Sequence, residues 1–391
     1  MKKIIETVIS IWFKLLGQLP KKNLVYFESF HGKQFSDNPK AIYDYLKKED
    51  TTLELVWGVT RGYEETFIEK KVPYISRFSL RWFFVMPRAK YWVINTRTPL
   101  WLSKNKHTTY IQTWHGTPLK RIGVDIEEVN IPGYTKESYD QEFLEESKRW
   151  DYLTSSSDYT TQHFNQAFGY TGQMISKGFP RNDQLVNREQ YKEKIGKLRA
   201  SLGIKTDKKI ILYAPTWRET DHKTADGYEF SIDFPYEEFV KTCGEEMVLL
   251  VRMHYLVAQT LDTSTWPKDK LIDVSLGYDM SDLLLMSDVL ITDYSSCMFD
   301  FSLTNRPMLF FMPDSTQYEE DIRGFYQPIQ SLLPGPVIKE QHKVIEQLQN
   351  LDTLDYEKEY QQFKQTFCNN ETGTSAQVVT EIIKKEMSEQ T

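Results

Sequence analysis

Residues 110–120 read YIQTWHGTPLK and join a short β-rich run to a loop that contains His115, Gly116 and Thr117. Short runs of this kind are typical of buried strands in a sheet. Glycine lets the backbone approach a ligand closely, threonine supplies a hydroxyl, and histidine can take a proton near neutral pH. We therefore predict a strand that ends in a functional loop. The alternative is a turn built around a structural histidine.

Similar runs recur along the whole chain, with helical stretches between them. The predicted strands are Asn23–Ser29, Leu53–Thr60, Val72–Ser76, Tyr91–Thr96, Tyr110–Trp114, Tyr152–Ser155, Ile210–Ala214, Met247–Arg252, Val289–Thr292 and Met308–Met312. The predicted helices are 39–49, 135–148, 158–168, 188–202, 236–242, 296–304, 341–350 and 375–388. This alternation favours an α/β fold with doubly wound parallel sheets and crossover helices.

The length of 391 residues suits two domains of ordinary size. We place the boundary in the charged segment 186–208, which gives domains 23–200 and 201–391 after an N-terminal helix over 1–22. The final helix either stays with the second domain or packs back on the first. Two Rossmann-like halves would leave a ligand crevice between them, at the carboxyl ends of the strands.

Composition and charge exclude several classes of protein. Apolar residues make up 40% and charged residues 26% of the chain, which is a globular balance. The three cysteines are far apart, so a disulfide scaffold and a zinc finger are not expected. The net charge of −7 is uneven: residues 1–100 hold 17 Lys and Arg against 10 Asp and Glu, and the rest holds 31 against 45. No nucleic-acid partner is expected, and the basic N-terminal part points to an anionic surface.

The first 22 residues have the pattern of an amphipathic helix. One face carries apolar side chains at three- and four-residue steps: Ile5, Val8, Ile9, Trp12, Leu15, Leu16 and Leu19. The run is too short and too interrupted to span a bilayer. It is suited to lying in a membrane interface, and the alternative is an ordinary helix packed on its own domain.

Residues 77–92, RFSLRWFFVMPRAKYW, interleave cations with aromatic side chains. Cations that reach phosphate headgroups and aromatics that favour the interface are typical of a membrane-docking surface. The alternative is a buried helix with a solvated basic face. The aromatic content of 14% is high, and we expect part of it at this surface, through Trp12, Phe13, Trp82, Phe83 and Phe84.

Polar residues also follow the predicted strands of the second half. Pro215 and Thr216 follow its first strand, and Arg252, Met253 and His254 follow the next. If that strand continues, Arg252 and His254 share a side and suit a phosphate or diphosphate. The alternative is an Arg–carboxylate ion pair beside a capping histidine.

Two further loops carry candidate ligand groups. Ser295 or Ser296 is placed to cap the next helix, whose free N–H groups and two hydroxyls would form an anion site. Asp300 would lie one turn further and accept bonds from a ribose or polyol, while the alternative is a plain helix cap. In the loop over 178–183, Arg181 either closes over a ligand or holds the hinge.

Familiar nucleotide and metal motifs are absent from the sequence. It contains no GxxxxGKS/T, no GxGxxG, no HExxH and no GxSxG. His115 and His254 lack an evident third ligand, so we expect no metal and no cofactor.

The motifs together resemble the CDP-glycerol glycerophosphotransferase family of teichoic acid synthesis, and most closely its shorter priming transferases. The resemblance extends over nearly the whole chain. The elements that carry it are WHGTPLK at 114–120, YAPTWR at 213–218, RMHY at 252–255, TDYSSCMFDF at 292–301, YFESFHGKQFSDNPKA at 26–41 and RGFY…LPGP at 323–336. Nothing in the sequence corresponds to the large extra N-terminal region of the polymerases. One departure is the start of the last helix, TGTSAQ at 372–377, which has no basic residue and receives no phosphate role.

This resemblance implies a GT-B-like fold, peripheral at the cytoplasmic face of the cell membrane, with a CDP-glycerol-binding second domain. The acceptor would be an undecaprenyl-diphosphate-linked disaccharide that bears glycerol phosphate, and other teichoic acid enzymes would be partners. The residues that would face the transferred glycerol phosphate are Trp114, His115, Gly116, Thr117 and Pro118. Those that would hold the CDP part are Arg181, Pro215, Thr216, Arg252, Met253, His254, Ser295, Ser296 and Asp300.

The implied reaction is an in-line displacement in which the acceptor hydroxyl attacks the β-phosphorus and CMP leaves. His115 would act as general base or as a donor to the developing charge, with His254 as the second catalytic residue. The alternatives are a CDP-ribitol or sugar-nucleotide donor on the same fold, and a non-catalytic membrane scaffold.

Overall fold

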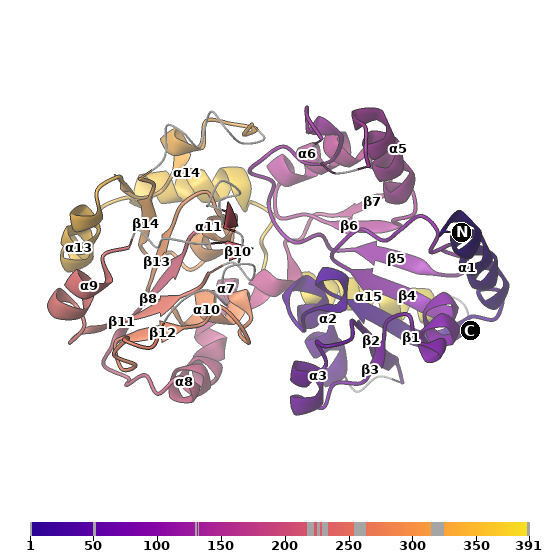
Figure 1. Cartoon of the computed structure of the whole chain (residues 1–391), viewed down its shortest axis with the longest axis horizontal. Coiled ribbons are helices and arrows are strands. Elements are labelled where there is room, and N and C mark those ends of the chain that lie inside the picture. Colours follow the sequence, from indigo (N-terminus) through magenta and orange to yellow (C-terminus); the bar gives the residue numbers. More distant parts are fainter. Residues whose placement is uncertain are drawn as a thin grey trace. The chain divides into compact units, whose positions relative to one another are not determined.

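The computed structural model describes residues 2–49, 52–129, 131, 133–216, 223–224, 227–228, 234–253, 263–313 and 324–388. The chain forms two compact α/β units (Figure 1). Unit 1 comprises residues 1–183 and 369–391, and unit 2 comprises residues 184–368.

Unit 1 is built on a seven-stranded parallel sheet in the order β3-β2-β1-β4-β5-β6-β7. The strands are β1 (Lys21–Glu28), β2 (Glu54–Val59), β3 (Tyr74–Ser76), β4 (Ala89–Ile94), β5 (Thr109–Gln112), β6 (Tyr152–Thr154) and β7 (Gln173–Ile175). β1 and β4 are buried along most or all of their length, because helices cover both faces of the sheet. The order reverses between β1 and β4, and ligands of such sheets bind outside the carboxyl ends of the strands at this switch point.

Two helical layers enclose this sheet. One face packs against α1 (Lys2–Leu16), α4 (Leu80–Val85), α5 (Lys136–Ser147) and α6 (Asp158–Phe168). The other packs against α2 (Asp37–Lys48), α3 (Glu65–Glu69) and α15 (Ser375–Ser388). The last helix of the chain therefore lies in unit 1, where the Tyr91 hydroxyl donates to the Ile383 carbonyl over 3.0 Å.

Unit 2 has a six-stranded parallel sheet in the order β12-β11-β8-β13-β14-β15. Its strands are β8 (Lys209–Ala214), β11 (Met247–Val251), β12 (Leu271–Asp273), β13 (Val289–Thr292), β14 (Met308–Phe311) and β15 (Val337–Ile338), and a small antiparallel pair joins β9 (Lys223–Thr224) to β10 (Gly227–Tyr228). The helices are α8 (Lys192–Ser201), α9 (Tyr236–Thr242), α10 (Met280–Met286), α11 (Cys297–Ser302), α13 (Gln341–Gln349) and α14 (Glu357–Phe367), and α7 (Asp183–Val186) lies at the division of the units. The switch point of this sheet lies between β8 and β13.

The structure divides the chain earlier than residue 200, where we placed the boundary. Helix α8 belongs to unit 2, because its side chains pair with that unit. Lys194 forms an ion pair with Asp282 at 2.6 Å, and the Arg199 guanidinium donates to the Lys208 carbonyl at 2.6 Å, directly before β8. The charged segment 186–208 is thus part of unit 2.

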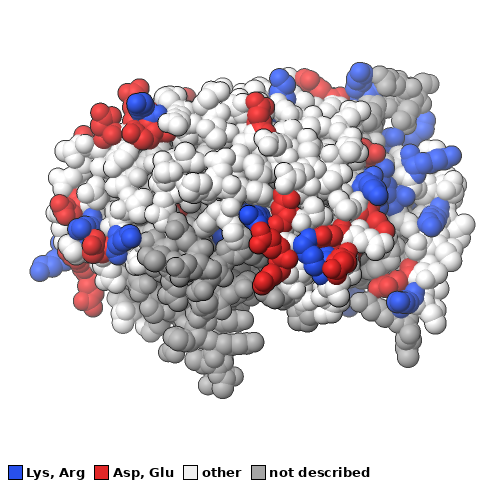
Figure 2. All heavy atoms as spheres, turned by 90° about the horizontal axis from the view of Figure 1, so that it is seen from above, with Lys and Arg blue, Asp and Glu red and all other residues white. Residues whose placement is uncertain are grey.

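Helix α1 is amphipathic, as predicted, but its buried side differs from the prediction. Phe13 and Trp82 are fully buried in the core of unit 1, so neither belongs to a surface. Their ring centroids lie 5.6 Å apart, and this contact anchors α1 to α4. The outward side carries exposed apolar residues, which we call the α1–α4 face: Ile4, Ile5, Val8, Ile11, Trp12, Leu15, Leu19, Leu80 and Phe84. Lys and Arg gather over the end of unit 1 that carries α1, at the right in Figure 2.

Candidate functional site

The candidate residues lie at the carboxyl edges of the two sheets, close to their switch points. In unit 1 the loop from Trp114 to Pro118 follows β5, beside the end of β4. In unit 2 Thr216 follows β8, and Ser295 and Ser296 follow the neighbouring β13. Parallel strands end at one edge, so the residues within each unit are brought to the same side of its sheet.

The side chain of His115 is held in one orientation. Its Nδ1 lies 2.7 Å from the Asn95 carbonyl oxygen. A carbonyl can only accept, so Nδ1 carries the proton, and in the neutral ring the lone pair is on Nε2. Burial lowers the pKa of His115, the Asn95 bond and Asp37 oppose that shift, and Arg181 adds to it. His115 is therefore neutral at pH 7, with Nε2 available as a base.

The backbone of this loop is strained where it turns toward the sheet edge. Trp114 has φ 49°, a left-handed conformation that is costly for a bulky side chain. Its ring stacks on the His115 ring, with 4.7 Å between the ring centroids, and also packs against Phe168 in the core. Gly116 follows with φ 154°.

The rest of the loop is anchored to helix α6 and the residues before it. The Thr117 hydroxyl lies 2.9 Å from that of Ser156, and the Pro118 carbonyl accepts from the Tyr159 hydroxyl at 3.0 Å. Within residues 114–118, His115 is partly exposed, whereas the other four residues are buried.

Arg181 lies in unit 1 and is buried. Its Nη1 lies 2.7 Å from Asp37 Oδ2 and donates to the His115 carbonyl at 2.8 Å. In this structure the guanidinium therefore supports the histidine loop. Its predicted contact with the CDP part stays a prediction.

Asn95 and His31 were not singled out from the sequence. Asn95 follows β4 directly, and its side-chain oxygen accepts from the Phe30 N–H at 2.9 Å. His31 has φ 58°, and burial together with Arg77, Lys33, His115 and Arg97 lowers its pKa to about 4. The available signal was their place directly after β1 and β4, the two strands of the switch point.

In unit 2, a buried carboxylate connects the loops after β8 and β13. Both Asp293 oxygens accept from the Thr216 N–H, at 2.8 and 3.1 Å. The Thr292 hydroxyl donates to the Ala214 carbonyl at 2.7 Å. Pro215 lies between these contacts, so the start of the loop that follows β8 is fixed.

Arg252 is anchored on the backbone after β12. Its Nη1 donates to the carbonyls of Val274 and Ser275 at 2.7 and 2.5 Å. The Met253 N–H donates to Ser275 Oγ at 2.9 Å, and Met253 is buried. Strand β11 ends at Val251, so the alternation that would bring Arg252 and His254 to one side has no strand to support it. His254 itself lies outside the described residues.

Of the two serines predicted to cap the helix after β13, Ser295 makes the contact and Ser296 does not. Ser296 occupies the N-cap of α11 but makes no capping bond, because it already has helical backbone angles. The Cys297 N–H instead donates to Ser295 Oγ over 3.5 Å. Both serines are partly exposed, whereas Asp300 is 5% exposed within α11.

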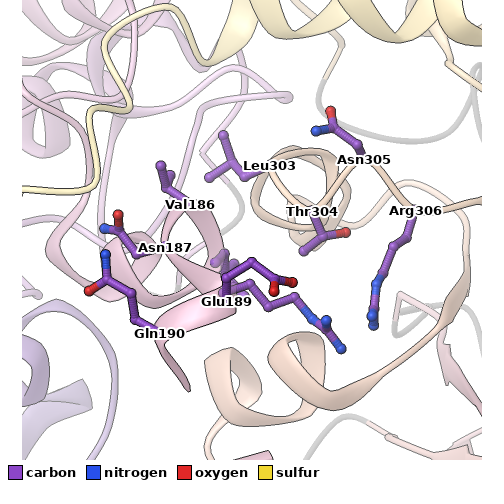
Figure 3. A pocket seen from close by; sticks show the side chains of 10 residues that line it. Val186, Asn187, Glu189, Gln190, Leu303, Thr304, Asn305 and Arg306 are labelled. Carbon is purple, nitrogen blue, oxygen red and sulfur yellow. The ribbon is translucent and has the colours of Figure 1, made fainter. Parts of the chain in front are cut away.

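A cavity of about 500 Å³ in unit 2 lies elsewhere. Glu189, Thr304 and Arg306 are among the residues that line it (Figure 3). Arg306 stands just before β14, so the cavity belongs to the amino edge of the sheet, opposite the candidate residues. Among the residues that the structure describes, no three His, Cys, Asp or Glu gather as a metal site.

Comparison with known proteins gives one consistent family. Residues 11–385 match the family described as CDP-Glycerol:Poly(glycerophosphate) glycerophosphotransferase. A teichoic acid glycerol-phosphate transferase of Staphylococcus aureus is 46% identical over 98% of this chain and 99% of its own length. A teichoic acid poly(glycerol phosphate) polymerase of Bacillus spizizenii is 41% identical over 97% of each chain. The match to a polymerase of this size corrects our expectation that the large extra N-terminal region separates polymerases from this chain.

Solved structures agree with these relatives. The wall teichoic acid polymerase TagF superimposes with a TM-score of 0.90 at 37% identity, over 100% of this chain and 96% of that one. One of the TagF structures is of a variant with histidine replaced by asparagine, soaked with CDPG. A UDP-N-acetylglucosamine 2-epimerase from Listeria monocytogenes superimposes with a TM-score of 0.52 at 15% identity, over 94% of this chain and 98% of its own. This is a likeness of fold alone. The two parallel-sheet units are consistent with a GT-B-like fold.

Proposed function

Since the chain belongs to the CDP-glycerol:poly(glycerophosphate) glycerophosphotransferase family, we propose that it transfers glycerol phosphate from CDP-glycerol to a lipid-linked acceptor and releases CMP. It is an enzyme of glycerol-phosphate transfer in teichoic acid synthesis. The acceptor in this proposal is the glycerol-phosphate end of an undecaprenyl-diphosphate-linked disaccharide. CDP-glycerol is supported as donor by the TagF variant soaked with CDPG.

The observation that carries the proposed mechanism is the orientation of His115. Its Nδ1 is occupied by the Asn95 carbonyl, so the Nε2 lone pair is the site that takes a proton. The acceptor hydroxyl forms a bond to the β-phosphorus, and the bond from that phosphorus to the bridging oxygen breaks. His115 receives the hydroxyl proton, and CMP carries away the electron pair.

Unit 2 supplies the groups that we propose for the CDP part. They are Pro215, Thr216, Arg252, Met253, His254, Ser295, Ser296 and Asp300, with Arg181 from unit 1. Arg252 and the two serines offer cationic and hydroxyl donors, which suit a diphosphate and a departing phosphate. The Thr216 N–H donates to Asp293, which fixes the start of the loop after β8, and the Arg252 guanidinium is held separately by the Val274 and Ser275 carbonyls.

Replacing His115 tests the mechanism. We expect His115→Ala to lower the transfer rate by about 10²–10⁴-fold, the usual contribution of a general base. CMP release from CDP-glycerol and a synthetic lipid-linked acceptor measures it, with His107→Ala, an exposed histidine of the same unit, as control. An intact rate in His115→Ala would remove this residue from the mechanism. No CMP release by the wild-type protein would instead favour the non-catalytic scaffold.

The donor and the number of units transferred need separate measurements. The ribitol-phosphate primase of Bacillus spizizenii is 28% identical, well below the glycerol-phosphate transferase. We therefore expect CDP-glycerol to raise the melting temperature more than CDP-ribitol or UDP-sugars. Mass spectrometry of products from acceptors with zero or one glycerol phosphate separates priming from polymerisation.

We also propose that the protein is peripheral at the cytoplasmic face of the membrane. None of the helices in the described part of the chain combines the length and apolar character that crossing a bilayer requires. The α1–α4 face supports docking instead, because its apolar side chains are exposed at the end of unit 1 where Lys and Arg gather (Figure 2). Trp12 joins the two helices, since its Nε1 donates to the Phe83 carbonyl at 3.0 Å.

A further inference from the structure

The loop that carries His115 is held by an unusual set of side-chain hydrogen bonds. Three consecutive backbone carbonyls, those of Thr113, Trp114 and His115, each accept from a side chain. Asn38 Nδ2 donates to the first two at 3.2 and 3.1 Å, and Arg181 Nη1 donates to the third at 2.8 Å. These bonds satisfy the three carbonyls and fix the path of the backbone.

The two donor residues are also joined to each other. Asn38 Oδ1 accepts from the Arg181 N–H at 3.1 Å, and Asp37 accepts from the Arg181 guanidinium at 2.7 Å. Asn38 is fully buried at the start of α2, and Asp37 beside it has φ 66°. Three separate segments, those at residues 37–38, 113–115 and 181, thus form one closed network.

The network acts on the strained residue. The two carbonyls that Asn38 binds belong to the peptides on either side of Trp114, the residue with φ 49°. A left-handed tryptophan backbone is strained and persists only where the surroundings hold it. The Thr113 carbonyl also accepts from the Thr154 hydroxyl at 2.7 Å, and the Trp114 N–H donates to the Gln112 side-chain oxygen at 2.9 Å. Against these remaining bonds, we expect loss of the Asn38 amide to loosen the Trp114 backbone and, with it, the contact of the His115 ring with the Asn95 carbonyl.

We propose that Asn38 is a positioning residue for the transfer reaction, which sets the orientation of His115 through the backbone of Trp114. The proposal rests on the proposed function only in that His115 is the base. Asp37 and Arg181 form the second arm of the same network. The charged and titratable groups that face His115 are Asp37 from α2, Arg181 from the loop after β7, and His31 from the loop after β1.

Kinetics of Asn38→Ala give the first test. We expect kcat to fall by up to about 10²-fold, as for a base that is misplaced by about 1 Å, while KM for CDP-glycerol stays within about twofold. The acid limb of the pH profile should move to higher pH, because a released His115 is less buried and its pKa returns toward the usual value. Asn23→Ala is the matched control, since Asn23 makes one amide–carbonyl bond of 3.0 Å in the same unit, away from His115. An unchanged kcat, or a fall with no movement of the acid limb, would overturn the proposal.

A second measurement does not depend on activity. NMR titration of 13C-labelled histidines, with the His115 signal identified by its loss in His115→Gln, follows the His115 pKa in wild type, Asn38→Ala and Asn38→Ser. We expect the His115 pKa to rise in Asn38→Ala and to rise less in Asn38→Ser, because the serine hydroxyl can keep one hydrogen-bond donor. The serine variant also serves as the test if the alanine variant does not fold. An identical His115 titration in a folded Asn38 variant would refute the positioning role. If the wild-type protein shows no transfer, the proposed function fails while this titration still decides the inference.

Discussion

At the scale of single residues, the balance of charges around His115 makes its pH dependence predictable. Burial lowers its pKa, Arg181 lowers it further, and Asp37 raises it. The base form exists above this pKa and is lost as the pH falls through it. We therefore expect the acid limb of kcat/KM for the wild type to have its midpoint below 6.5.

A charge change at Asp37 tests the sign of this argument. Asp37→Asn removes the group that raises the His115 pKa and leaves Arg181, which lowers it. The acid limb should therefore shift to lower pH, in the direction opposite to Asn38→Ala, whatever happens to the maximal rate. The measurement is kcat/KM from pH 4.5 to 8, and a shift to higher pH would show that His115 responds to loop position rather than to this charge.

The sequence predicted some of these residues and not others, for a physical reason. His115 was predictable because a β-rich run precedes it and a glycine follows it, a pattern that indicates the end of a strand. Asn38 was not, because its partners lie 75 and 76 residues further along the chain. Only the folded topology brings the start of α2 to the end of β5.

At the scale of elements, the α1–α4 face predicts membrane binding. The paired substitution Ile4→Ser and Val8→Ser removes side chains that are 69% and 60% exposed, so folding should be unaffected. Full burial of such a side chain is worth about 1.5–3 kcal/mol, and partial insertion of both should change vesicle affinity by about tenfold or more.

Vesicle co-sedimentation with phosphatidylglycerol-containing liposomes measures this effect. Ile68→Ser is the matched control, because Ile68 is 60% exposed on α3, away from the α1–α4 face. Equal losses for both variants, or none for the α1 pair, would contradict the membrane role of this face.

Elements were predictable where burial leaves a long apolar run. β8 and β13 are buried on both faces and are apparent in the sequence, whereas β12 and β15 have three and two residues and give no periodicity. Phe13 shows the opposite difficulty. Helix α1 has apolar residues on both its core and its outer side, so a helical pattern alone could not decide which side is buried.

At the scale of the whole molecule, the chain returns to unit 1 after completing unit 2. Helix α15 covers one face of the unit 1 sheet, with Val379 and Ile383 fully buried against it. Asp183 binds its first turn, accepting from the Ser375 and Ala376 N–H groups at 2.9 and 2.8 Å. The first 183 residues therefore lack part of their core until the last helix is in place.

This connection predicts that a substitution in α15, near the end of the sequence, destabilises unit 1 and leaves unit 2 unchanged. We expect Ile383→Ala to lower the free energy of unfolding of unit 1 by about 2–5 kcal/mol, through lost burial and the cavity that it leaves. Scanning calorimetry should show one transition shifted to lower temperature and the other unchanged, while Glu381→Ala, an exposed position on the same helix, shifts neither. If Ile383→Ala moves both transitions together, the two units unfold as one cooperative block, and α15 stabilises the whole molecule rather than the sheet that it covers.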